Sequence, residues 1–513
     1  MMLVWMILIP FLAGILAWAV GSRGPFAEKG NALFCRWISL TALAAELALA
    51  IYIWRLGSPY SSSWLAKINA PWIPAFGIGF HLAMDGISLL FVLLASLLGI
   101  AAVIASWTEI DRQVGFFHFM LLSALTGIIG VFTAFDLFLF SFFWELMLVP
   151  MYFLIALWGH EKRTVAAVKF FIFTQLSGLL MLISILGLYF IHGRQTGVYT
   201  FDYFALLGMP IPSGIASLIL FGFLAAFLVK LPAVPFHTWL PDAHTEAPTA
   251  GSVILAGLLL KTGGYGLLRF ALPLFPAAVA EIAPLCMTLG VIGILYGAIL
   301  AFAQTDLKRL VAYTSVSHMG FVLLGIFART ETAMMGAIIQ MLSHGISTGA
   351  LFILAGALQE RLHTRDMQRM GGLWAAAPRL GGVWLFFALA SLGLPGMGNF
   401  IGEFLVLLGT YRVSPIMTVL AALGFIVSSI YSLLMVQKVF FGNASETWKI
   451  PDLFHREITV MAVMIAMILW LGLHPRPFLD TARNGLANIG KMSSPALQEV
   501  IRTTVPGGAH DAP

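Results

Sequence analysis

The chain alternates between long apolar stretches and short polar segments along most of its length. A helix needs roughly 20 mainly apolar residues to cross a membrane, and about 14 stretches of this sequence meet that requirement. Only 10% of the 513 residues are charged, whereas a soluble domain carries roughly 25%, so lipid must be the main solvent. The candidate spans are 3–20, 32–54, 82–106, 116–132, 137–158, 170–191, 215–229, 250–270, 282–302, 310–327, 333–358, 383–408, 416–441 and 458–473.

Two of these spans are interrupted by proline. The seventh runs into KLPAVP at residues 230–235, and the twelfth contains GLPGMGN at residues 393–399. Proline removes a backbone donor and clashes with the preceding turn, so each helix should break there. The breaks lie five spans apart, in spans 4–8 and 9–13, which is the layout of an inverted-repeat transporter.

The sequence therefore predicts an all-α polytopic membrane protein with two inverted five-helix repeats, each containing a broken helix. Its predicted parts are the first three helices (1–115), the first repeat (116–270), the second repeat (282–441), and the last helix with a C-terminal tail (442–513). The tail from residue 475 onward is expected to be poorly ordered or to lie on the surface.

The basic residues between the spans indicate an orientation. With the N-terminus outside, the cytoplasmic loops hold roughly 14 Lys and Arg against about 6 in the opposite loops, as the positive-inside rule requires. Both termini are thus predicted to be periplasmic. The same assignment counts Lys308 as a cytoplasmic loop residue and Arg269 as a periplasmic one.

A few ionisable residues fall inside the spans rather than between them. A charge at the bilayer centre costs at least about 3 kcal/mol, so such residues usually face the protein interior and serve a function there. For the two histidines of this set, a neutral buried role is as plausible as a role in proton relay. The set consists of Glu145, Lys230, Lys261, His318, His344 and Glu403.

These side chains suit the movement of protons. Desolvation favours the neutral form of a buried Lys or Glu, and a nearby opposite charge favours the charged form. A Glu145–Lys230 pair at about 4 Å would be worth about 4 kcal/mol at an effective dielectric near 20, so its separation would release the Lys230 proton. Lys261, the histidines and Glu403 would then pass the proton along a hydrated path. His237, Asp242 and His244 are a candidate proton entrance.

Other kinds of chemistry lack a pattern in the sequence. Cys35 and Cys286 stand alone in apolar segments, and His237, Asp242 and His244 lack the ligand spacing of a metal site. A phosphate-binding loop and a Gly-x-Gly-x-x-Gly turn after a strand are also missing, which argues against a bound nucleotide or flavin. The net charge of +5 comes without a basic, aromatic-rich run, so nucleic acid is not an expected partner.

The motifs around the breaks resemble the antiporter-like membrane subunits of respiratory complex I. The sequence KLPAVPFHTWLPDAH at 230–244 is similar to that family's signature, and EAPTAGS at 246–252 is similar to the subunit M branch. LSHGISTGALF at 342–352, ERLHTR at 360–365 and the segment 393–404 extend the resemblance over nearly the whole chain.

The resemblance implies a proton-translocating subunit of a bacterial inner-membrane NADH:quinone oxidoreductase, with 14 helices. Glu145 and Lys230 resemble its coupling pair, Lys261 and Glu403 its connecting and exit residues, and His318 and His344 its central histidines. It implies that NADH, FMN, the iron–sulfur clusters and quinone bind to partner subunits. The neighbours in the membrane would include the antiporter-like subunits L and N.

Two other functions are compatible with part of this pattern. A subunit of a multisubunit sodium/proton antiporter, or of a proton-pumping hydrogenase, shares the broken helices and the buried Lys and Glu; the subunit M version of 246–252 argues against both. A passive membrane scaffold would not need Glu145, Lys230, Lys261 and Glu403 at the membrane midplane, because buried charges without a function are only a cost.

Overall fold

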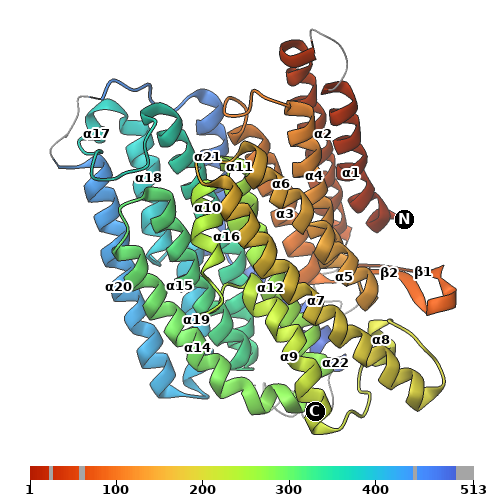
Figure 1. Cartoon of the computed structure of the whole chain (residues 1–513). Helices are drawn as coiled ribbons and strands as arrows, with labels where there is room; N and C mark the ends of the chain where they lie inside the picture. Colours follow the sequence, from red (N-terminus) through yellow and green to blue (C-terminus); the bar gives the residue numbers. More distant parts are fainter. Residues whose placement is uncertain (22–26, 57–63, 443–447, 493–513) are drawn as a thin grey trace, which may run out of the picture.

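The computed structural model describes residues 1–21, 27–56, 64–442 and 448–492. Helices dominate it and run roughly side by side, with α1 at one end of the molecule and α20 at the other (Figure 1). In the described part of the chain, 13 helices are long and apolar enough to cross a membrane. A polytopic helical membrane protein is thereby confirmed.

The N-terminal part contains the first three spans and a β-hairpin, which the sequence did not predict. Strands β1 and β2 pair antiparallel, with Ala66 opposite Met84, and the backbone carbonyl of Gly77 at their turn accepts a hydrogen bond from Phe201. Gly77 has a φ of +65°, and an added Cβ would collide with the Tyr199 backbone, so this turn requires glycine. The elements are α1 (Met2–Gly21), α2 (Ala27–Leu56), β1 (Ala66–Ile73), η1 (Pro74–Phe76), β2 (Ile78–Met84) and α3 (Gly86–Ala105).

The next block contains the first predicted break. Helix α9 ends at Lys230 and α10 begins at Trp239, so the interruption lies where the prolines predict it. The fifth span is also divided, between α5 and α6, because Pro150 has no N–H for the carbonyl of Leu146. The elements are α4 (Val114–Thr133), α5 (Leu137–Leu146), α6 (Leu148–Trp158), α7 (Arg163–Thr196), α8 (Tyr203–Leu206), α9 (Ser213–Lys230) and α10 (Trp239–Glu246).

The eighth span is an irregular helix in the centre of the molecule, buried over its whole most apolar window. Two π-helical turns widen it, and such turns often mark functional positions. Its parts are α11 (Thr249–Ile254), η2 (Leu255–Leu259), α12 (Leu260–Gly266), η3 (Leu267–Ala271) and α13 (Leu272–Leu274).

The last block contains the second predicted break. The twelfth expected span is two half-helices, α18 and α19, each too short to count among the 13 long helices; together with these 13 it accounts for the expected 14 spans. The elements are α14 (Pro276–Phe302), α15 (Leu307–Phe327), α16 (Glu331–Leu362), α17 (Leu373–Ala376), α18 (Pro378–Ser391), α19 (Gly398–Tyr411), α20 (Pro415–Phe440), α21 (His455–Leu473) and α22 (Arg476–Met492).

The segment after α21 is not an unstructured tail up to residue 492. Helix α22 packs against α3 and α16 and buries Phe478, Ala482 and Leu486, which recur on one helical face. Of the two expectations for this segment, poor order is wrong up to residue 492, because α22 packs its apolar stripe against the helix bundle; the other expectation, that the segment lies on the surface, is not contradicted. Residues 493–513 lie outside the described residues.

Candidate functional site

Buried polar side chains from four different spans meet in the centre of the molecule. The Lys261 ammonium group in α12 lies 2.7 Å from His344 Nδ1 in α16. The ring of His344 lies 5.4 Å from the ring of His318 in α15, and His318 Nδ1 lies 2.8 Å from a Glu403 carboxylate oxygen in α19. At most 2% of any of these four side chains is exposed. The structure thus brings together four of the predicted residues in one string, here called the central string.

Lys261 is held at one end of the central string by the irregular helix itself. Its Nζ donates to the carbonyl of Ala256, at 2.5 Å, in the π-helical turn η2. The lysine therefore has two polar neighbours, a carbonyl oxygen and the ring nitrogen of His344. Of these two contacts, only the one to His344 can carry a proton, because the carbonyl serves only as an acceptor.

Glu403 is positioned at the other end by the broken helix. Gln340 Nε2 donates to the same carboxylate oxygen as His318, at 2.8 Å, and Ser391 Oγ contacts His318 Nε2 at 3.1 Å. The break lets the chain turn at Gly393, whose φ of +81° suits glycine and whose added Cβ would come within 3.2 Å of Glu403 Oε2. The interruption therefore places a carboxylate among polar groups rather than against lipid.

Glu145 and Lys230 are neighbours but do not form the direct pair that the sequence predicts. Lys230 Nζ has no hydrogen-bond partner among the described residues, and its ion-pair distance to Glu145 exceeds 4.0 Å. The lysine instead lies 5.4 Å from the ring centre of Trp144 and 5.6 Å from that of Phe170. Glu145 interacts electrostatically with Lys230 and hydrogen bonds to Gln175. The structure therefore shows an open pair, and the predicted contact at about 4 Å is wrong for this state.

The three residues of the predicted entrance have different surroundings. Asp242 is partly exposed and forms ion pairs with Lys169 at 2.6 Å and Arg309 at 3.1 Å. His237 is buried against Tyr296, with 5.6 Å between ring centres. His244 is fully buried and stacks on Phe352, with both ring nitrogens lacking a partner among the described residues. Of the three, only His244 interacts electrostatically with Lys261 of the central string.

Two charged residues that the loop assignment placed at the membrane surface are fully buried. Arg269 lies inside η3 and forms a 2.5 Å ion pair with Asp85, the N-cap of α3. Lys308 lies in the first turn of α15 with none of its surface exposed. Both had been counted as loop residues, and that count is wrong. Arg269 falls within the expected eighth span, 250–270, and lies in η3. Lys308 lies in a helix because α15 begins at Leu307, before the expected span 310–327.

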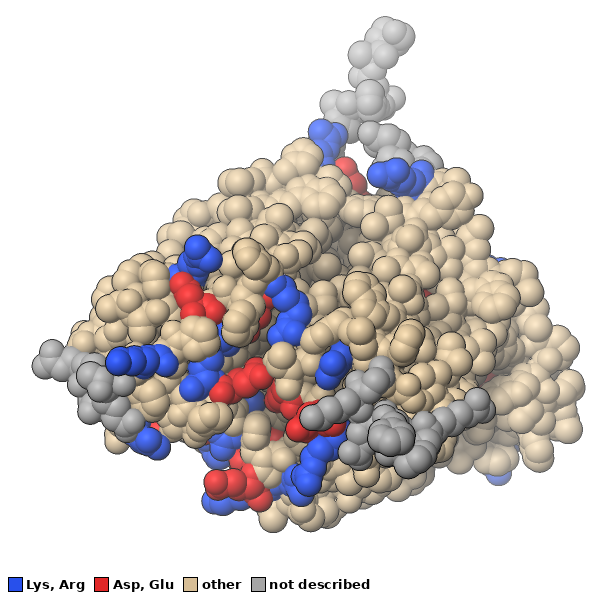
Figure 2. Space-filling view, turned by 90° about the horizontal axis from the view of Figure 1, so that it is seen from above, with Lys and Arg blue, Asp and Glu red and all other residues tan. Residues whose placement is uncertain are grey.

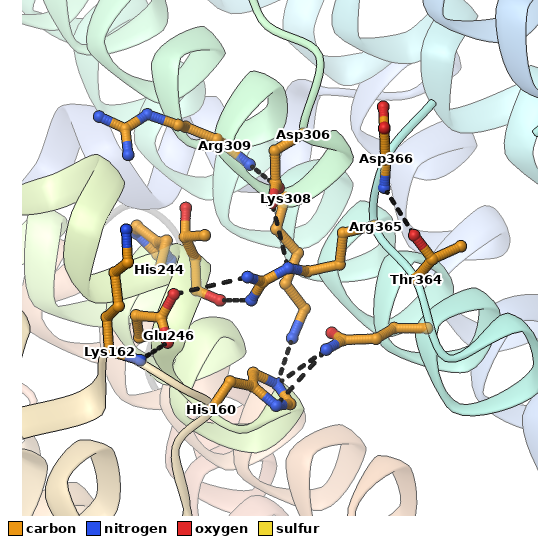
Figure 3. Close-up of polar contacts among 12 residues, drawn as sticks. His160, Lys162, His244, Glu246, Asp306, Lys308, Arg309, Thr364, Arg365 and Asp366 are labelled. Atoms are coloured by element: carbon orange, nitrogen blue, oxygen red, sulfur yellow. Dashed lines mark hydrogen bonds and ion pairs between the residues drawn. The ribbon is translucent and has the colours of Figure 1, made fainter. Parts of the chain in front are cut away.

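One face of the molecule gathers most of the visible charges, with Lys and Arg mixed among Asp and Glu (Figure 2). His160, Glu246, Lys308 and Arg365 form a polar cluster where the loop after α6, the end of α10, the start of α15 and the loop after α16 meet (Figure 3). Arg365 contacts Asp306 at 3.1 Å and Glu246 at 3.5 Å. This cluster was not predicted from the sequence.

Comparison with known proteins identifies the family. Residues 134–430 match the family described as NADH:quinone oxidoreductase/Mrp antiporter, TM, which is more than half of the chain. The chain belongs to this family. The matched residues include both broken helices and all four residues of the central string.

Individual members of the family are similar over nearly the full length. NADH-quinone oxidoreductase subunit M of Escherichia coli K12 is 52% identical over 504 residues, which cover 95% of this chain and 97% of that protein. The subunit M of Pseudomonas aeruginosa is also 52% identical, over 97% of this chain and 99% of that protein. A chain of respiratory complex I from Thermus thermophilus superposes with a TM-score of 0.83 at 32% identity, covering 95% of this chain and 99% of that one.

Proposed function

We propose that this antiporter-like chain is the subunit M of a bacterial respiratory NADH:quinone oxidoreductase and carries protons across the inner membrane. The observation that supports this most is the central string, in which Lys261, His344, His318 and Glu403 meet within the protein interior. Four buried ionisable groups are a large cost to a fold, and proton transfer is a function that requires them.

The central string supports a sequence of proton transfers. An ammonium group at Lys261 gives its proton to His344 Nδ1 at 2.7 Å, and the resulting imidazolium passes a proton toward His318. His318 gives it to the Glu403 carboxylate, which becomes neutral and then loses the proton on the exit side. Each step moves one proton between a donor and an acceptor. Glu403, His318 and His344 return to their starting states, and Lys261 is left neutral until it takes up a new proton.

The open Glu145–Lys230 pair provides a means of control. When the two charges approach, the charged form of Lys230 is favoured, and when they separate the lysine gives up its proton more readily. The aromatic rings of Trp144 and Phe170 stabilise the ammonium group in the open state. Redox energy from partner subunits would act by changing this separation.

The redox chemistry belongs to other subunits in this proposal. NADH, FMN, iron–sulfur clusters and quinone would bind there, and subunits L and N would flank this chain in the membrane. Both termini would face the periplasm, and residues 116–270 and 282–441 would form two inverted repeats. The redox-free sodium/proton antiporter is the alternative that the family name leaves open; the 52% identity to a protein named subunit M favours the oxidoreductase.

The test is a measurement of NADH-driven proton transport in sealed membrane vesicles that contain the assembled complex. Lys230→Ala is expected to lower proton transport roughly twofold to thirtyfold, the range for residues of a coupled network. Lys438→Ala, at an exposed lysine near the end of α20, serves as the matched control. Undiminished transport in Lys230→Ala would remove this residue from the mechanism. Normal transport after neutralising Glu145, Lys230, Lys261 and Glu403 together would favour a scaffold.

A further inference from the structure

A surface cavity lies beside the polar cluster and shares His160 with it. This cavity of about 350 Å³, here called the vestibule, lies between the loop after α3, the loop after α6 and the end of α16. About half of its lining surface is polar, and the lining includes Glu109, His160, Gln359 and Glu360. Water enters a polar cavity of this size readily, so the vestibule brings solvent below the surface of the bundle.

Lys308 does not line the vestibule itself but contacts His160, which does. Its Nζ makes two long contacts, at 3.4 Å to His160 Nε2 and at 3.4 Å to the carbonyl of Ala247 (Figure 3). Gln359 Nε2 contacts the same ring nitrogen of His160 at 3.2 Å, and Gln359 Oε1 has no partner among the described residues. The ammonium group is thus fully buried yet loosely held, which suits a group that gains and loses a proton.

The neighbouring charges are bonded far more tightly. Arg365 contacts the carbonyl of Thr245, Glu246 and Asp306, and the second Glu246 oxygen accepts the backbone N–H of Lys162 at 2.8 Å (Figure 3). These charged and polar groups are hydrogen-bonded or ion-paired to one another, so their side chains are fixed in place. Lys308 differs because no carboxylate of the described residues lies within 4.0 Å of its Nζ.

Two ionisable side chains, Glu109 and His160, line the vestibule close to Lys308. Glu109 accepts the backbone N–H of Thr249 at 3.0 and 3.1 Å, and burial raises the pKa of its carboxyl although Lys308 opposes this. Burial, followed by the charges of Lys308 and Arg365, lowers the pKa of His160 to about 3. His160 therefore stays neutral at physiological pH and can accept a hydrogen bond from Lys308 without taking its charge.

A buried histidine connects Lys308 with the central string. His244 is within electrostatic range of both Lys308 and Lys261, and its ring nitrogens have no partner among the described residues. Its stacking on Phe352, at 4.5 Å between ring centres, fixes the plane of the imidazole. A neutral imidazole offers one donor and one acceptor nitrogen, as a relay between two lysines requires.

We propose that the vestibule is the proton entrance of this subunit and that Lys308 is its first proton carrier. A hydronium ion in the vestibule gives a proton to neutral Lys308 and leaves water behind. The ammonium group then gives that proton to His244, and the imidazolium gives it to Lys261; both transfers pass through intervening water, because the ring nitrogens of His244 have no direct hydrogen-bond partner among the described residues. This inference rests on the proposed function. The entrance predicted from the sequence consisted of His237, Asp242 and His244. The entrance proposed here retains His244 and includes Glu109 and Lys308 instead of His237 and Asp242.

The test compares substitutions at Lys308 in the assembled complex, with native electrophoresis to verify assembly. Lys308→Arg keeps the positive charge but does not release a proton, and Lys308→Gln keeps a donor without the charge. Both are expected to lower NADH-driven proton transport at least about threefold, within the range for coupled networks. Normal transport in Lys308→Arg would show that the lysine has a structural role and would overturn the proposal.

A second measurement does not depend on the folding of a Lys308 variant. In Gln359→Cys, a membrane-impermeant charged methanethiosulfonate should block transport when added on the side of the vestibule. The native Cys35 and Cys286 are buried, and Gln368→Cys, an exposed position beyond the vestibule, is the control. Full transport after labelling at residue 359, or equal loss in the two variants, would contradict the entrance.

A parallel variant separates the two proposals. If Lys261→Met transports protons normally, the proposed function itself fails. If Lys261→Met is defective and the Lys308 variants and the labelled Gln359→Cys protein all transport normally, only the entrance is wrong.

Discussion

His318 and Glu403 meet in the core of the molecule, with 2.8 Å between His318 Nδ1 and a carboxylate oxygen and with 2% of each side chain exposed. They come from α15 and from the second half of the broken span, 85 residues apart in the chain. Because Gln340 donates to the same oxygen, the carboxylate is held even when the imidazole is neutral. The position of the Glu403 carboxylate therefore does not depend on the protonation state of His318 alone.

This relationship leads to the first prediction. Glu403→Gln keeps a hydrogen-bond acceptor for His318 and Gln340 but cannot take up a proton, so the fold should remain while proton transport falls, by roughly twofold to thirtyfold. The measurement is the rate of vesicle acidification against the rate of NADH oxidation. Glu331→Gln, at a partly exposed residue in the first turn of α16, is the control. Equal transport in both variants would exclude Glu403 as a proton carrier.

Lys261 provides the second prediction. Lys261→Arg keeps a permanent charge beside His344, and arginine does not release its proton in proteins. The fully buried site also has little room for a guanidinium group. Transport is expected to fall as far in Lys261→Arg as in Lys261→Met, roughly twofold to thirtyfold. Recovery of transport in the arginine variant alone would mean that charge, rather than proton transfer, is what this position requires.

The buried Asp85–Arg269 pair provides the third prediction, which concerns stability. Removing one partner of a buried ion pair leaves an uncompensated charge, at a cost of roughly 3–5 kcal/mol. Arg269→Met should therefore lower the thermal midpoint of the solubilised complex, and the double variant Asp85→Asn, Arg269→Met should recover part of the loss. Asp85 also caps α3 through the backbone N–H groups of Ile87 and Ser88, which asparagine can still accept. A double variant less stable than both single variants would contradict this account.

Much of the fold could be predicted because the apolar stretches and the prolines act locally. The breaks after Lys230 and at Gly393 follow from proline and glycine chemistry, and both are confirmed. The β-hairpin was missed because its strands depend on pairing with each other and on contacts from residues 199–201, which no local pattern reveals. Helix α22 was missed because its short apolar face is stabilised by packing against α3, a contact that the local sequence does not reveal.

The central string shows where prediction from sequence ends. Each of its residues was found by its position within a span, but the order of contact, from Lys261 through His344 to His318, depends on how the helices pack. Lys308 was missed since it stands near a loop, although its spacing to Val311 and Ala312 puts it on the buried face of α15. That periodicity is the signal that would have found it.

Asp242 provides the last prediction, because sequence and structure give it different roles. As part of the entrance predicted from the sequence, Asp242→Asn should impair transport; in the structure Asp242 pairs with Lys169 and Arg309 away from the vestibule. These side chains are between 28% and 39% exposed, so the ion pairs contribute only about 0–1 kcal/mol each. Asp242→Asn is therefore expected to change transport less than about twofold, a small fraction of the Lys308→Arg effect. The two variants should be measured in the same vesicle preparation. A loss in Asp242→Asn as large as that in Lys308→Arg would restore the entrance at His237 and Asp242 and would show that the vestibule is not the main route.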